Sequence, residues 1–155
     1  MKRWAYMLLT VLAVSAFGGR TGAGVDVAKL HPVELVSVIC TEQRVRIQTD
    51  TGDWGEGVNL QAAIQDLHRT ASAEVFLETA EYLLIDEDGE ALLPELMDYL
   101  RPSCGVCILQ GDPELEDVAA YLKIHRPTTT LIQYRGGMKK LQTLKVAKGR
   151  MELVS

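Results

Sequence analysis

The chain has 155 residues, which favours a single domain, and its 21 acidic residues outnumber its 16 basic ones, giving a net charge of −5 at neutral pH. This balance, with no basic cluster, argues against nucleic-acid binding, which requires neutralisation of phosphates, and against electrostatic docking on anionic lipid. The composition is that of an ordinary globular domain, so we expect one packed core.

Residues 1–23 have the features of an export segment. Lys2 and Arg3 precede an apolar run from Ala5 to Phe17, and small residues that suit a signal peptidase follow. The run is shorter than the roughly 20 residues that span a bilayer comfortably, and both a cleaved signal peptide and a retained anchor stay open. Without residues 1–23, 13 basic residues face 21 acidic ones, a net charge of −8. We expect an exported protein, secreted or at the outer face of a membrane, with a linker at 24–32 and one α/β domain at 33–155.

The domain is predicted to open with a hairpin. Val33 to Cys40 is β-rich, Arg44 to Thr49 alternates strictly, and the turn falls near Glu42. The alternation indicates a strand with one solvated face, near a sheet edge. Residues 50–57 are predicted to form a turn-rich loop, with Trp54 on the core rim. Its carboxylates lack the spacing of a calcium loop, so a solvated connection is preferred.

A helix, a strand and a second helix are predicted next. Asn59 can cap the first helix, whose inward face is Leu60, Ala63, Ile64 and Leu67. An apolar strand from Val75 to Ile85 follows, and Asp86 to Glu90 is read as a solvated loop. The second helix should begin near Ala91 or Leu92, because proline at 94 fits only the first turn, and end at Leu100.

The last third is predicted to contain strands at 104–110, 128–134, 141–146 and 151–154, and one helix that Asp112 caps, with Pro113 in its first position. The element order is therefore β-β-α-β-α-β-α-β-β-β. This order predicts a mixed, largely parallel sheet with three helices. The predicted core consists of Leu35, Val38, Val45, Ile47, Leu60, Ile64, Leu67, Phe76, Leu83, Ile85, Leu92, Leu96, Leu100, Val106, Ile108, Leu115, Val118 and Leu122.

The sequence Cys104-Gly105-Val106-Cys107 has the spacing of a redox pair or of half a zinc site. It follows a helix end and enters a strand, so no helix N-terminus lowers a thiol pKa. Cys40, His31, His68 and His125 are scattered without ligand spacing, and His68 suits the end of a helix. We therefore expect structural thiols, with a Cys104–Cys107 disulfide as the alternative, and no catalytic, cofactor-binding or metal-binding residues.

Four segments carry a family resemblance: ELVSVICTEQRVRIQTDTG, EGVNLQAAIQDL, VFLETAEYLLIDEDGEALLPELMDYLR and CILQGDPELEDVAAYL. They share with the N-terminal domain of Ger(x)C-type spore germination proteins, the C subunits of germinant receptors, an opening hairpin and a glycine before a capped L-x-x-A helix. A short strand ending in Leu-Ile, an acidic stretch and a helix ending in D-Y-L-R follow in the same order. From about Val33 to Leu122, the chain thus resembles this family.

The chain departs from the family in three respects. It has no lipobox cysteine, Thr79-Ala80 stand where the family often has a histidine, and it ends at Ser155 where the family continues into further domains. The resemblance implies a truncated stand-alone relative without enzyme activity or cofactor, acting in assembly or signalling beside the membrane subunits of a germinant receptor. An extracytoplasmic small-ligand-binding module and a CxxC thiol-redox protein remain the alternatives.

Overall fold

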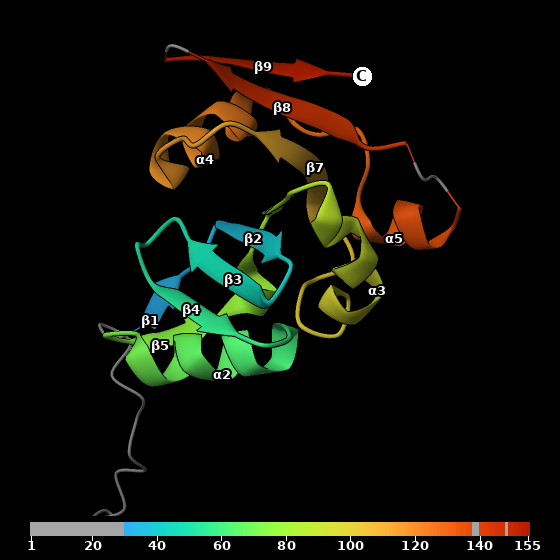
Figure 1. Ribbon diagram of the computed structural model, residues 1–155. Coiled ribbons are helices and arrows are strands. Elements are labelled where there is room, and N and C mark those ends of the chain that lie inside the picture. The colour runs from blue at the N-terminus through green and yellow to red at the C-terminus, as the bar shows by residue number, and fades with distance from the viewer. Residues whose placement is uncertain (1–29, 138–139, 148) are drawn as a thin grey trace, which may run out of the picture.

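The computed structural model describes residues 30–137, 140–147 and 149–155 (Figure 1). The predicted export segment at 1–23 and residues 24–29 of the predicted linker lie outside these residues. The end of that linker is not irregular, because Leu30–Pro32 form strand β1. Within the described residues, no helix is long and apolar enough to cross a membrane.

The domain is built on a mixed seven-stranded sheet with the strand order β4-β3-β2-β6-β7-β8-β9. Its central strands β2, β6, β7 and β8 run parallel, and antiparallel strands extend it at both sides. A mixed α/β fold is therefore confirmed, but half of the strand pairs in this sheet are antiparallel, so it is not largely parallel. The strands are β2 (Leu35–Thr41), β3 (Arg44–Thr49), β4 (Trp54–Gly57), β6 (Tyr82–Ile85), β7 (Gly105–Gln110), β8 (Gln142–Ala147) and β9 (Arg150–Val154).

Helices cover both faces of the sheet, unequally. The described residues contain the α-helices α2 (Leu60–Thr70), α3 (Leu93–Leu96), α4 (Leu115–Ile124) and α5 (Leu131–Arg135) and the 3-10 turns η2 (Leu77–Thr79) and η3 (Asp88–Leu92). Helices α2, α3 and α5 pack on one face, and α4 packs alone on the other (Figure 1). Three helices were predicted, and the fourth, α5, replaces a predicted strand.

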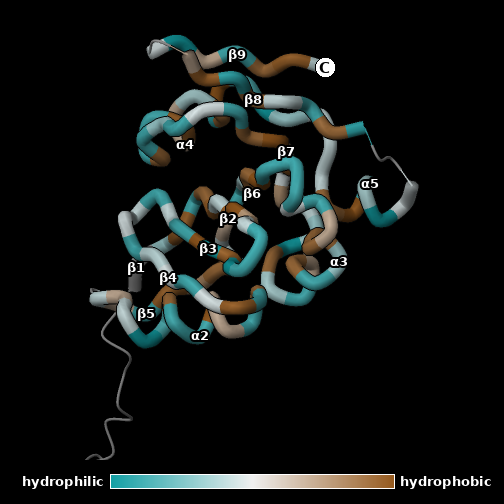
Figure 2. The backbone as a smooth tube through the Cα atoms, viewed as in Figure 1, coloured by the Kyte–Doolittle hydropathy of each residue, from teal (hydrophilic) through white to brown (hydrophobic). Residues whose placement is uncertain are grey.

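The sheet divides the core into two clusters. The larger, the α2 cluster, joins the inward residues of α2, α3 and α5 to those of β2, β3, β6 and β7. The smaller, the α4 cluster, consists of Leu35, Tyr82, Leu84, Cys107, Leu115, Val118, Ala119, Leu122 and Leu144. Figure 2 shows these hydrophobic stretches along the strands and the helical turns that face them. The predicted core residues are buried, except that Phe76, Leu92 and Ile108 are only half-buried.

Local sequence explains α2 well. Asn59 Oδ1 accepts a hydrogen bond from the backbone N–H of Ala62 at 2.8 Å, as its predicted capping role requires. The four predicted inward residues of this helix are all buried. The β2–β3 hairpin also forms as predicted, with its turn at Glu42 and Gln43.

The predicted strand from Val75 to Ile85 is interrupted. Its first part is β5 (Glu74–Phe76), which pairs with β1 in a separate two-stranded sheet, and only β6 joins the main sheet. Turn η2 separates them, and the Thr79 hydroxyl bonds the backbone of Val33 and Phe76 there. A threonine that bonds the local backbone favours a turn over a continuous strand.

Two helices begin or end at other residues than the sequence predicted, the one expected to end at Leu100 and the one expected after Asp112. The former begins as η3 and continues as the short α3, with Pro94 in its first turn, and irregular turns carry the chain to a buried Leu100. Helix α4 begins at Leu115 after Glu114, and no side chain caps it, so the prediction that Asp112 caps it was wrong.

The predicted strand at 128–134 was also wrong. Thr130 makes one isolated bridge with Gly105, and α5 begins directly after it. Thr130 and Gln133 form a reciprocal capping box, in which each side chain satisfies a backbone N–H at the helix start. This pair outweighs the β-branched character of the three threonines that precede the helix.

The segment 50–57, which was predicted to be a loop, contains strand β4. Two glycines of this strand, Gly55 and Gly57, pack against α2. A Cβ atom on Gly55 would lie 2.7 Å from Leu67 Cα, and one on Gly57 would lie 2.6 Å from Ala62 Cβ. These glycines therefore let a strand pack directly against the backbone of a helix.

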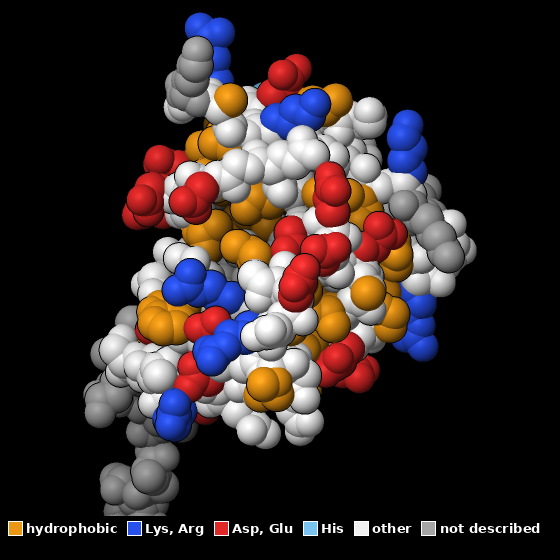
Figure 3. Space-filling view, viewed as in Figure 1, with side chains coloured by type: hydrophobic (Ala, Val, Ile, Leu, Met, Phe, Trp, Pro, Cys, Tyr) orange, Lys and Arg blue, Asp and Glu red, His pale blue; other side chains and the backbone are white. Residues whose placement is uncertain are grey.

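Helix α4 leaves the β3–β4 end of its sheet face uncovered. Trp54 is 47% exposed there, and the Arg46 guanidinium lies 4.9 Å from the centre of its ring. The prediction that Trp54 folds onto the core rim was thus wrong, because the residue projects to the solvated face. Figure 3 shows hydrophobic side chains between α4 and the β2–β3 hairpin, with carboxylates over the segment leading into α3.

Candidate functional site

The two cysteines of the CGVC sequence lie in different clusters. Cys104 packs in the α2 cluster, whereas Cys107 packs in the α4 cluster on the opposite face, and both are buried free thiols. Burial raises the pKa of each thiol to about 12, so neither is a ready nucleophile at neutral pH. The Cys104–Cys107 disulfide remains a prediction, and its formation would require one side chain to leave its cluster.

We expect Cys104 and Cys107 to react slowly with a disulfide reagent such as DTNB at about pH 8, where an ordinary thiol of pKa ~8.5 reacts readily. Half-buried Cys40, whose pKa burial and the nearby Asp86 and Asp88 raise to about 11, should react first. In denaturant all three should react at once, which supplies the control. A CGVC thiol as fast in the native protein as in denaturant would contradict this expectation.

The acidic segment after β6 contains a carboxylate with a structural role. Asp86 Oδ2 accepts a hydrogen bond from the Cys40 backbone N–H at 2.6 Å, and Oδ1 accepts one from the Gly89 N–H at 2.7 Å. Asp86 thus joins the end of β2 to the first turn of η3. The neighbouring Glu87 and Asp88 are exposed, in keeping with the predicted solvated loop.

The loop at 50–57 likewise uses its first carboxylate structurally. Asp50 accepts hydrogen bonds from the backbone N–H groups of Glu34 and Leu35, at 3.2 Å each. Burial raises the pKa of Asp50, against the opposing effect of these hydrogen bonds. In the described part of the chain, no group of three or more His, Cys, Asp or Glu residues is placed to hold a metal ion.

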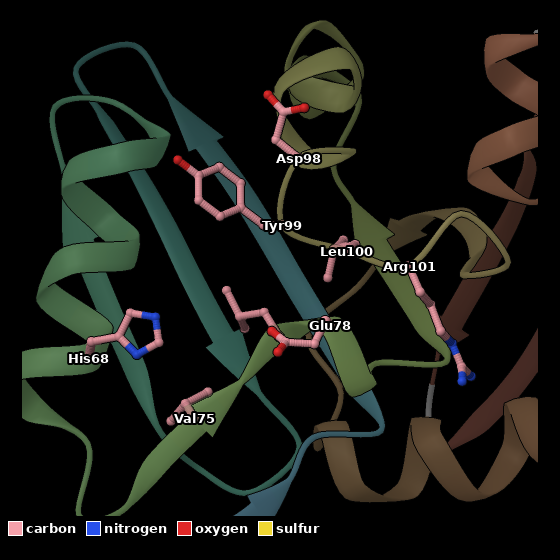
Figure 4. A pocket seen from close by; sticks show the side chains of 8 residues that line it. His68, Val75, Glu78, Asp98, Tyr99, Leu100 and Arg101 are labelled. Carbon is pink, nitrogen blue, oxygen red and sulfur yellow. The ribbon is translucent and has the colours of Figure 1, made fainter.

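A hollow of about 370 Å³ lies between the end of α2, β5 and the turns after α3 (Figure 4). His68, in the last turn of α2 as predicted, faces Glu78 and Val75 across it. The side chains of Asp98 and Arg101 turn away from these residues. The polar groups of this hollow therefore do not converge on a common point, as a binding or catalytic site requires.

A smaller cavity of about 140 Å³, which we name the β6–β7 end pocket, lies at the amino ends of β6 and β7. It is lined by Glu81, Tyr82, Arg101, Ser103, Arg126 and Thr130, together with Gly105 and Pro127. Arg101 Nη2 pairs with Glu81 Oε1 at 3.2 Å. Charged, hydroxyl and phenol side chains thus line one cavity. None of its residues was predicted to form a site.

Comparisons with known proteins identify no relative: no family model, no curated protein and no solved structure matches this chain.

Proposed function

We propose that this chain is a non-enzymatic, exported or membrane-associated component of spore germination, related to the N-terminal domain of Ger(x)C-type proteins. The principal support is the glycine that precedes the L-x-x-A helix in both. Gly57 meets the backbone of Ala62 and Ala63, and Ala63 is the alanine of that pattern. The glycine and the alanine of the shared pattern thus lie where strand β4 packs closely against helix α2. A requirement for small residues at one contact supports the resemblance more strongly than a shared apolar pattern does.

The proposed location and partners follow from the sequence. Residues 1–23 would direct export and either be removed or retain the domain at the outer face of a membrane. There the domain would act beside the membrane subunits of a germinant receptor. Its net negative charge fits neither nucleic acid nor a bare anionic lipid surface as a partner.

Deletion of the gene in its spore-forming host tests this proposal. We expect spores that form normally but respond more slowly, or not at all, to at least one germinant, measured as the fall in optical density. The full-length gene should restore the response, whereas a copy lacking residues 2–23 should not, because its product would stay inside the cell. Spores that respond to every germinant like the parent would refute the germination role.

Of the two alternatives, the β6–β7 end pocket favours an extracytoplasmic small-ligand-binding module. The geometry gives the thiol-redox alternative no support. The two CGVC thiols pack in clusters on opposite faces of the sheet, and burial raises the pKa of each. An appreciable rate of dithiol–disulfide exchange by the purified protein would revive that alternative.

A further inference from the structure

Two residues that line the β6–β7 end pocket each have a buried hydrogen-bond donor without an acceptor. Tyr82 is 3% exposed, and neither its Oη nor Arg101 Nε has a hydrogen-bond partner in the described part of the chain. Buried polar groups in native proteins are nearly always paired, and leaving one unpaired is costly. Because both donors belong to residues that line one cavity, they favour an occupant with acceptor atoms that small side-chain movements would bring within reach.

The charges around the pocket favour an anion. Arg101 and Arg126 contribute two guanidinium groups, and Glu81 contributes one carboxylate, so the lining has an excess of one positive charge. Glu81 pairs with Arg101 at Nη2, and the Arg101 Nε–H has no acceptor among the described residues. Guanidinium nitrogens are donors only, and an unionised phenol can also donate. A cation would find one carboxylate here, already paired with an arginine.

The phenol of Tyr82 is suited to donate. Burial raises its pKa, and the neighbouring Arg126 and Lys123 act in the opposite direction without reversing the shift. The group is therefore protonated at neutral pH and can offer its O–H to an acceptor. Ser103 and Thr130 add hydroxyl groups to the lining.

The backbone around the pocket is fixed before any ligand arrives. The Gly105 N–H donates to the Glu81 carbonyl at 2.9 Å, and the Val106 N–H donates to the Thr129 carbonyl at 2.8 Å. These bonds tie β6, β7 and the segment after α4 together at the point where the pocket lies. A fixed backbone limits the cost of binding to the ordering of the side chains that line the pocket.

We infer that the β6–β7 end pocket binds a small oxyanion, a carboxylate or a phosphate group, between Tyr82, Arg101 and Arg126. Such groups present two or more acceptor oxygens and match the planar donor edge of a guanidinium. A cavity of about 140 Å³ has room for a group of this size. The inference stands independently of the germination role.

Calorimetric titration of the purified full chain with sodium acetate and with inorganic phosphate, in chloride buffer at constant ionic strength, tests the inference. We expect saturable binding of at least one anion with a dissociation constant of about 1 mM or tighter. The anion that binds more tightly identifies the group as carboxylate or phosphate. Tyr82→Phe and Arg126→Gln should each weaken binding about tenfold or more, since each removes a hydrogen bond in a charged cluster.

Tyr121→Phe and Arg69→Gln are matched controls and should bind like the wild type. Neither residue lines the pocket, and Arg69 pairs with Asp66 on α2. Without added anion, Tyr82→Phe should melt at the same or a higher temperature than the wild type, because it removes a buried unpaired hydroxyl. A lower melting temperature would show that this hydroxyl already has a partner in the protein, and would overturn the inference.

Absence of saturable binding by either anion would also overturn the inference, since water alone would then fill the pocket. Wild-type affinity in both Tyr82→Phe and Arg126→Gln would place any anion elsewhere on the molecule, with the same consequence. Arg126 is exposed, so Arg126→Gln should fold like the wild type. Its binding measurement therefore decides the test even if the buried substitution Tyr82→Phe disturbs the structure.

Discussion

Replacing Gly55 by valine should destabilise the domain by about 3 kcal/mol or more, the upper range for overpacking. Even a single methyl group at this position would overlap the backbone of α2, with its Cβ 2.7 Å from Leu67 Cα. Backbone atoms cannot rotate away as a side chain can. Strand β4 and helix α2 would therefore have to separate and expose the buried face of Leu60, Ile64 and Leu67.

Urea unfolding, followed by circular dichroism, measures this cost. The matched control is Gly136→Ala, because Gly136 has an ordinary φ of −73° and an added Cβ would come no nearer than 3.4 Å to its neighbours. That variant should unfold within about 0.5 kcal/mol of the wild type, as surface substitutions usually do. Equal unfolding midpoints for Gly55→Val and the wild type would show that α2 does not pack on β4 as described.

Replacing Asp86 by alanine is expected to cost about 3 kcal/mol, because it removes two hydrogen bonds to a charged acceptor. The backbone N–H groups of Cys40 and Gly89 would lose the carboxylate oxygens at 2.6 and 2.7 Å. The end of β2 would then no longer be joined to η3. The same urea unfolding experiment provides the measurement.

Asp88→Ala separates this structural role from simple electrostatics. Both carboxylates raise the pKa of the Cys40 thiol, so either substitution should lower that pKa and speed its reaction with DTNB. Asp88 is exposed, so its replacement should leave stability nearly unchanged. Equal stability of the two variants would show that the hydrogen bonds of Asp86 contribute little.

Local sequence rules correctly predicted the elements in which one continuous segment of the chain supplies the residues that determine the structure, such as a capping residue and a buried face. Asn59 and the apolar face of α2 are within one continuous segment, and so are the alternating residues of β3. The rules failed where a distant segment determines the structure. The loop-like sequence of β4 becomes a strand because β3 pairs with it and α2 packs on its glycines. Helix α5 and turn η2 carried local indications that were not used, the Thr130–Gln133 capping box and the Thr79 hydroxyl bonded to Phe76.

The β6–β7 end pocket could not be predicted from residue spacing. Tyr82, Arg101 and Arg126 follow or precede different elements, and only the packing of strand ends brings them together. In the sequence, Tyr82 reads as one more apolar strand residue, and the arginines read as helix ends. An unpaired buried donor is a property of the assembled structure and leaves no pattern in the chain.

The strand order also determines which contacts can form early when the chain folds. Strands β2 and β3 are neighbours in sequence, so their hairpin can close quickly, and β4 and α2 can join it locally. The other edge of β2 stays unpaired until β6 forms, because β6 pairs with it from Leu35 opposite Tyr82 onward. In the same way, the outer edge of β7 stays unpaired until β8 forms. Until β6 arrives, β2 presents an unpaired and largely apolar edge, the kind of edge that templates aggregation. Delivery of the later segments should therefore set the folding rate of this domain, and a chain stalled before Tyr82 would be the form most prone to self-association.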